Sequence, residues 1–154
     1  MHVSEGRPLF IIVTGRIYVG EGGDEEHEMM VNNVFGKLTR GVVSGGARVV
    51  FEDDTGGVYE VPGGIVTVAS KSYLLVGRGR RSIPVILVVQ DLLYPFRRPE
   101  AVTSEIQRGV KLLEKLIKRA LPQDYASRTR LVVVDARIAD APFSLDQIES
   151  VPER

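Results

Sequence analysis

The sequence predicts an α+β protein in which an antiparallel β-meander packs with one shorter and one long helix. Short apolar runs rich in β-branched residues and separated by glycine-rich turns indicate the meander. Two segments with a 3.6-residue apolar period indicate the helices. The chain has 154 residues, which is the usual size of one domain, so we expect a single domain over residues 1–154.

The first part of the chain is expected to form a long strand and then the shorter helix. Residues 10–19 are mostly apolar and β-branched, and Gly15 interrupts the run at a position that suits a β-bulge. Over residues 24–40 the apolar side chains share one helical face, while acids fill the first turn and basic residues the last, as the helix dipole favours. Gly41 is the expected end of this helix.

Four or five short strands are predicted in the middle of the chain. The turns between them contain glycines, which supply the positive φ angles that tight hairpins need. Pro84 has no N–H to donate, so its strand is expected to lie at a sheet edge or to begin there. The predicted strands cover roughly residues 47–52, 58–61, 65–69, 72–76 and 83–89.

The clearest helix follows, from Glu100 to Leu121, and Pro122 ends it. Its main apolar row keeps a 3.6-residue period, and further leucines widen the apolar face. The helix therefore either lies deep in the core or also meets a second subunit, and we expect a homo-oligomer. The leucines expected at the interface are Leu112, Leu116 and Leu121.

The end of the chain is predicted to form one more strand and a turn. The strand covers residues 130–138, and Ser144 with Gln147 indicates a short capped turn after it.

Composition excludes several classes of protein. The chain has no cysteine, which excludes disulfides, thiolate nucleophiles and sulfur-ligated zinc and weakly favours the cytosol. Its apolar runs are far shorter than the roughly 20 residues of a transmembrane helix, and residues 1–7 lack the layout of a secretory signal. The 15 arginines against 5 lysines, with few Asn and Gln, are compatible with a heat-adapted source.

The charge is unevenly distributed, although the net charge is zero. Residues 1–69 hold 5 basic and 10 acidic side chains, residues 70–137 hold 14 and 6, and residues 138–154 hold 1 and 4. The middle segment therefore carries +8, between segments of −5 and −3.

Part of this basic excess lies beside aromatic residues, a combination typical of single-strand binding. Arginine neutralises phosphate, and bases stack on aromatic rings for roughly 1–3 kcal/mol each. Two other interpretations stay open: solvated arginines with rings in the core, or a basic middle that meets the acidic ends of a neighbouring subunit. The candidate nucleic-acid-binding residues are Tyr73, Arg78, Arg80, Arg81, Tyr94, Phe96, Arg97 and Arg98.

Nucleotide binding and histidine chemistry have little support. The glycine-rich segment 20–23 lacks the lysine and hydroxyl of a P-loop, and the acids that follow it repel phosphate. The two histidines, His2 and His27, are not at the spacing of metal ligands. We therefore expect no cofactor.

One carboxylate set keeps a metal-dependent nuclease as the alternative function. Neighbouring strands would gather Asp53, Asp54 and Glu60, with Asp91 as a further candidate, around magnesium. A restriction-type nuclease would want a lysine two residues after Glu60, where Pro62 stands. Turn formation explains the two aspartates better, so we expect no catalytic site and no bound metal.

The order of elements also resembles a known family. A β-rich part with one helix is followed by the Arg78-Gly79-Arg80-Arg81 loop, the Tyr94-Pro95-Phe96-Arg97-Arg98 segment and the helix Val102 to Leu121. This layout, over most of the chain, resembles that of the ThermoDBP-related single-stranded DNA-binding proteins of hyperthermophilic archaea. The resemblance implies a sheet cleft for the strand and an oligomer built partly through helices. The strand and acidic tail predicted after the long helix depart from that layout.

The leading hypothesis is thus a non-catalytic, oligomeric, cytoplasmic protein that binds single-stranded DNA, with RNA as a further partner to test. The alternatives are the small metal-dependent nuclease and a homo-oligomeric adaptor for another protein.

Overall fold

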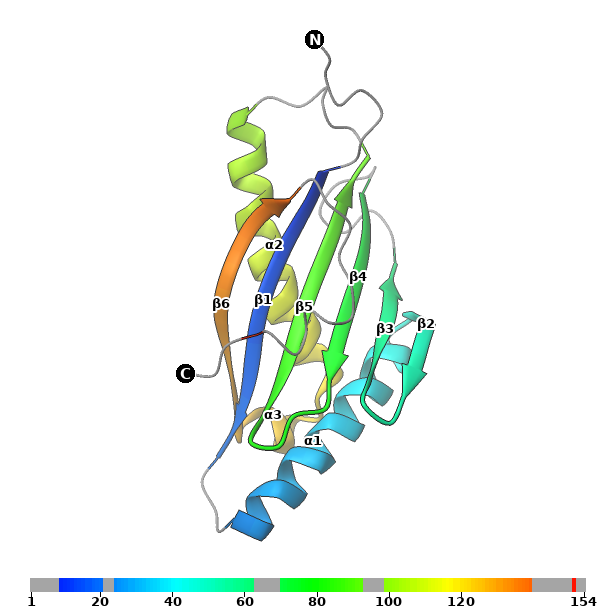
Figure 1. The fold of residues 1–154 in the computed structure, drawn as a ribbon, viewed down its shortest axis with the longest axis vertical. Helices are drawn as coiled ribbons and strands as arrows, with labels where there is room; N and C mark the ends of the chain where they lie inside the picture. The colour runs from blue at the N-terminus through cyan, green and yellow to red at the C-terminus, as the bar shows by residue number, and fades with distance from the viewer. Residues whose placement is uncertain (1–8, 21–23, 63–69, 93–98, 140–150, 152–154) are drawn as a thin grey trace.

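A computed structural model describes residues 9–20, 24–62, 70–92, 99–139 and 151. Six strands form one antiparallel sheet, and α1 and α2 lie together behind it in the view of Figure 1. The α+β class with an antiparallel meander and a long helix is confirmed. The elements are β1 (Leu9–Val19), α1 (Asp24–Ser44), β2 (Arg48–Asp53), β3 (Gly56–Val61), β4 (Ser70–Gly77), β5 (Ser82–Asp91), α2 (Pro99–Ala120), α3 (Gln123–Ala126) and β6 (Thr129–Ala139).

The strand order is β2-β3-β4-β5-β1-β6, so β2 and β6 are the two edges. The hairpins from β2 to β5 are adjacent as a meander predicts, while β1 inserts between β5 and the last strand. Of the two expectations for the Pro84 strand, an edge position is wrong, because β5 pairs on both sides, whereas Pro84 does lie near the start of the strand, two residues after Ser82. The β4–β5 register ends at Val85, so Pro84 pairs with β1 but lies outside the ladder with β4, a position where a missing N–H is tolerated.

The main core lies between the sheet and the two long helices. Side chains of alternate residues in β1, β4 and β5 point to this face and meet the apolar sides of α1 and α2. Among them, Val13, Leu87 and Leu113 are fully buried.

The opposite face of the sheet is also apolar at its centre. Ile12, Leu75, Ile86 and Val88 form a second buried cluster with Val151 from the end of the chain. Burial on both faces explains why β5 is apolar almost throughout instead of alternating.

Arg16 fixes Val151 on this second face. The Arg16 guanidinium is buried and donates hydrogen bonds to the Val151 carbonyl at 3.2 and 3.0 Å and to Ser82 Oγ at 2.7 Å. Burying a guanidinium is costly unless its donors are satisfied, so these bonds account for its place within the sheet.

Helix α1 is longer than predicted, because it does not end at Gly41 but continues to Ser44. Gly41 lies where α1 crosses the end of α2: a Cβ there would stand 1.8 Å from the Ala120 carbonyl oxygen. The glycine serves close helix packing, and the chain turns only at Gly46, whose φ is 107°.

Helix α2 uses its wide apolar face within its own chain. Leu112 and Leu121 are buried in the main core and Leu116 is half-buried against it. Of the two alternatives for this face, the structure favours the deep position in the core. These three leucines therefore do not form the exposed patch from which a helix-mediated interface was predicted.

The remaining expectations are confirmed in part. The register of β1 with β6 shifts between Thr14 and Gly15, where a bulge was expected, and a Cβ on Gly15 would stand 2.9 Å from the Val132 carbonyl. The strand predicted at residues 65–69 and the turn at Ser144 and Gln147 lie outside the described residues. The short helix α3 was not predicted. Across the ranges described above, no helix is long and apolar enough to cross a membrane.

Candidate nucleic-acid interface

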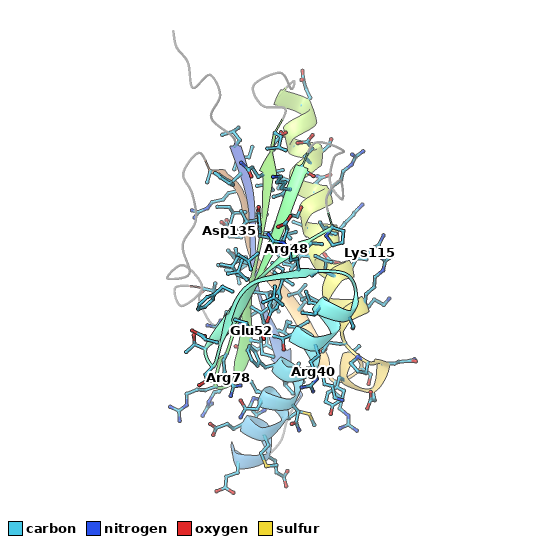
Figure 2. The ribbon with its side chains drawn as sticks, turned by 90° about the vertical axis from the view of Figure 1, so that its right-hand side faces the viewer. Arg40, Arg48, Glu52, Arg78, Lys115 and Asp135 are labelled. Atoms are coloured by element: carbon cyan, nitrogen blue, oxygen red, sulfur yellow. The ribbon has the colours of Figure 1, made fainter. Side chains whose placement is uncertain are left out.

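A groove between α1 and β2 is the main cavity of interest. It has a volume of about 560 Å³ and is open at the surface near the loop 78–81 that joins β4 to β5. Figure 2 shows Arg40 from α1, Glu52 from β2 and Arg78 from this loop in the same region of the molecule. The α1–β2 groove, as we call it, is lined by Phe35, Gly36, Thr39, Arg40, Val43, Ser44, Val49, Glu52, Asp53, Asp54, Tyr59 and Arg78.

Arg78 is held over an aromatic ring at this groove. Its guanidinium carbon lies 4.9 Å from the centre of the Phe35 ring, and its Nη1 donates to Asn32 Oδ1 at 3.5 Å. The backbone N–H of Arg78 donates to the Thr55 carbonyl at 2.8 Å, which ties the loop to the β2–β3 turn. Phe35 is buried beneath an exposed, oriented cation, a geometry that leaves the outer face of the guanidinium available for an anion or a stacked ring.

Tyr59 lies at the base of the groove. Its ring is fully buried, and its hydroxyl donates to Glu52 Oε2 at 2.5 Å. Burial raises the pKa of the Tyr59 hydroxyl well above its ordinary value, and the bond to Glu52 raises it further. The hydroxyl therefore stays protonated at all physiological pH values and acts as a donor.

The carboxylates of the alternative nuclease site do not come together around one point. Asp53 Oδ1 accepts from the backbone N–H and the hydroxyl of Thr55, at 2.8 and 2.7 Å, and these bonds hold the pKa of Asp53 below its ordinary value. This is the turn-forming role that the sequence favoured.

Glu60 has a separate partner. It forms an ion pair with Arg48, its cross-strand neighbour on β2, and this contact raises the pKa of Arg48. Glu60 is four residues along β3 from Gly56, the partner of Asp53, or roughly 13 Å. Over the described residues, no three His, Cys, Asp or Glu side chains are close enough together to hold a metal ion.

The other two loop arginines extend the basic surface next to the groove. Arg80 and Arg81 are exposed in the loop 78–81. The Arg81 carbonyl lies 3.1 Å from His27 Nε2, so the start of α1 anchors the loop tip. The acidic first turn of α1, with exposed Glu25, Glu26 and Glu28, stands beside this loop.

The other predicted binding residues are not found at the groove: Tyr73 lies on the far face of the sheet, and the remaining four lie outside the described residues. Tyr73 is half-buried on β4 and lies opposite Glu60, on the sheet face away from α1. It is therefore separated from Arg78 by the sheet. Tyr94, Phe96, Arg97 and Arg98 lie outside the described residues. The chain enters their segment after β5, at the end of that strand opposite to the loop 78–81.

Sequence reasoning missed most of the lining residues of the groove, including the two aromatic ones and the second arginine. Phe35 and Arg40 belong to α1, and Tyr59 belongs to β3. In the helix predicted over residues 24–40, Phe35 belongs to the apolar face and Arg40 to the basic last turn, and no local pattern connects either of them with Arg78. A Tyr within a predicted apolar strand was the one available signal, since a buried hydroxyl usually finds a partner.

Comparison with known proteins adds no family assignment: no protein-family model matches the chain, and no curated protein matches it at a significant level.

Proposed function

We propose that this chain binds single-stranded DNA in the α1–β2 groove and does not cleave it. The observation that carries the proposal is the Arg78 guanidinium stacked on Phe35 at a groove that Arg40 also lines. Two cations at one cavity, one of them held over a ring so that its outer face can stack on a base, are elements that single-strand binding uses.

The size and the chemistry of the groove support this function. Its volume of about 560 Å³ falls in the range of roughly 300–1,000 Å³ that small-molecule sites occupy, so it accommodates a nucleotide unit. Arg40 and Arg78 would neutralise phosphate oxygens. Glu52, Asp53 and Asp54 also line the groove, and the exposed Asp54 carboxylate would accept hydrogen bonds from amino groups at base edges.

The adjoining loop supports a longer path for the strand. Arg80 and Arg81 follow Arg78 in the same loop and are exposed, so neighbouring phosphates would meet two further cations. The resemblance to ThermoDBP-related proteins points to the same ligand. Asp53 and Glu60 are already engaged with Thr55 and Arg48, which favours binding over metal-dependent cleavage.

The test is a titration of fluorescent oligothymidylate at several salt concentrations, with and without magnesium. We expect affinity to fall steeply with salt, and Arg78→Ala to reduce the slope of log affinity against log salt by about 0.7. Arg78→Ala and Arg40→Ala should each weaken binding at least tenfold, since a hydrogen bond to a charged group contributes about 1.5–3 kcal/mol. The oligonucleotide should remain intact in magnesium.

Lys115→Ala is the matched control. Lys115 is an exposed cation on α2 and does not line the groove (Figure 2), so its removal should change affinity little. Absence of binding at low salt, or equal losses in Lys115→Ala and Arg78→Ala, would refute the proposed site. Degradation of the oligonucleotide in magnesium that Asp53→Ala with Asp54→Ala abolishes would establish the nuclease alternative.

A further inference from the structure

The edge strand β2 exposes a run of apolar residues. Val49, Val50 and Phe51 are 42–47% exposed, and Val43 in the last turns of α1 is 38% exposed beside them. Val43 and Val49 both line the α1–β2 groove, whereas Phe51 pairs with Val58 and so lies towards the opposite face of the sheet. The edge strand is therefore apolar on both of its faces. Contiguous apolar surface on a sheet edge usually marks a place where another chain pairs.

The backbone of β2 is open on its outer side. In the part of the chain that the structure describes, β2 has a neighbour on one side only, namely β3. The register irregularity between Val49 and Phe51 also leaves Val50 without a β3 partner. An edge strand with unpaired N–H and C=O groups is a template for an added strand.

The other edge of the sheet is protected by charge. On β6, Arg130, Asp135 and Arg137 are exposed along the edge strand, and Asp135 and Arg137 pair with each other at 3.6 Å. Charged side chains are a common means of preventing edge-to-edge pairing. Each edge thus carries three exposed charged side chains, but on β2 they flank three consecutive apolar residues that are more than 40% exposed, and this difference points to β2 as the interacting edge.

The charges at the two ends of β2 favour one orientation of a second copy, in addition to the contacts of Arg48 with Glu60 and of Glu52 with Tyr59 within the chain. The strand reads Arg48, then three apolar residues, then Glu52 and Asp53. Two copies paired antiparallel would place the basic end of each against the acidic end of the other, with the apolar residues facing each other in the middle. A parallel arrangement would oppose like charges, which is unfavourable on neighbouring strands.

We infer that β2 is a homodimer interface, in which the β2 strands of two copies pair antiparallel about a two-fold axis within one residue of Val50. The two sheets become one continuous sheet. An axis perpendicular to the sheet keeps both α1 helices on the same side, so Val43 and Val49 of the two copies meet along the joined strands. This differs from the helix-mediated interface that the leucines of α2 had suggested.

Cysteine cross-linking tests the pairing directly, because the natural chain contains no cysteine. A Cys at position 50 lies near the axis, so Val50→Cys should form a covalent dimer under mild oxidation. Disulfides need Cα atoms within about 7 Å, and in antiparallel pairing the two copies of residue 53 stand roughly 20 Å apart. Asp53→Cys should therefore remain monomeric on a denaturing gel, as should Met29→Cys, a control at an exposed position on α1.

Light scattering without nucleic acid provides the second readout. The unmodified protein should be dimeric at tens of micromolar, Val50→Glu should be monomeric, and Ile138→Glu on β6 should stay dimeric. Circular dichroism should show that Val50→Glu remains folded, since Val50 is exposed. Because a bulge can turn an edge strand away from partners, a monomeric unmodified protein would show that the irregularity at Val50 protects this edge. A monomeric unmodified protein, cross-linking of Asp53→Cys equal to that of Val50→Cys, or dissociation by Ile138→Glu alone would overturn the inference.

Discussion

Tyr59 shows how one buried hydroxyl links the base of the groove to the strand that borders it. The hydroxyl donates to Glu52 on β2, and burial on β3 keeps it protonated. Since Val50 and Phe51 precede Glu52 directly, this bond holds the edge strand in place from its buried side. Removing the hydroxyl would leave the Glu52 carboxylate without that donor.

The raised pKa of Tyr59 predicts a specific loss of stability in alkali. An unfolded tyrosine ionises near pH 10, whereas the folded one keeps its proton to higher pH, so the unfolded state binds fewer protons above pH 10. The stabilisation is therefore fully present below pH 10 and declines above it, by up to about 1.4 kcal/mol per pH unit.

Urea unfolding at pH 8 and at pH values between 10 and 11.5 measures this effect. The free energy of unfolding should fall more steeply with pH in the natural protein than in Tyr59→Phe, which lacks the titrating group. Parallel pH profiles for the two proteins would show that Tyr59 titrates normally.

At the scale of elements, α1 contains two glycines with opposite roles. Gly41 touches the Ala120 backbone of α2, where an added Cβ would be only 1.8 Å from a carbonyl oxygen. At Gly36 the nearest atom to an added Cβ is the flexible Arg40 Nη1, at an ordinary 3.5 Å. The intrinsic helix propensity of Ala and Gly is the same at both sites, so only the surrounding packing distinguishes them.

Alanine at these two positions should therefore change stability in opposite directions. Gly36→Ala should stabilise the protein by up to about 1 kcal/mol, because it removes backbone entropy from the unfolded chain. Gly41→Ala should destabilise it by about 1–3 kcal/mol, because α1 and α2 must move apart. Denaturant midpoints with unchanged m values would report both effects, and a stabilising Gly41→Ala would contradict the close crossing of the helices.

For the whole molecule, pairing through β2 would join two binding sites. Each α1–β2 groove lies directly beside the proposed seam, and the two-fold axis places both grooves on the same side of the joined sheet. Arg40 and Arg78 of both copies would then border one extended surface. A strand bound at one groove reaches the second at a high effective concentration.

This arrangement predicts that dimerisation strengthens binding only for long strands. The oxidised Val50→Cys dimer and the Val50→Glu monomer should bind an oligonucleotide of about 8 nucleotides equally per site, since one module covers about 4–16 nucleotides. With about 24 nucleotides, the dimer should bind at least tenfold more tightly. Equal affinities at both lengths would show that the grooves act independently even if the dimer forms.

The sequence by itself determined the elements and the kind of chemistry that the surface offers. The strands at residues 10–19 and 130–138, the helix that Pro122 ends, and the basic loop 78–81 are correctly predicted, because apolar period, turn residues and charge depend on neighbours within a few positions. The same local patterns correctly indicated that Asp53 forms a turn.

Only the tertiary structure decided which of these residues meet. The central place of β5, the burial of Leu112 and Leu121, and the contact of Arg78 with Phe35 depend on strand order and helix crossing. These are set by how whole apolar faces exclude water together, and that energy depends on surfaces that are distant in the chain. A local pattern shows that a face is apolar, but not what covers it, so the groove and the exposed edge of β2 became visible only in the fold.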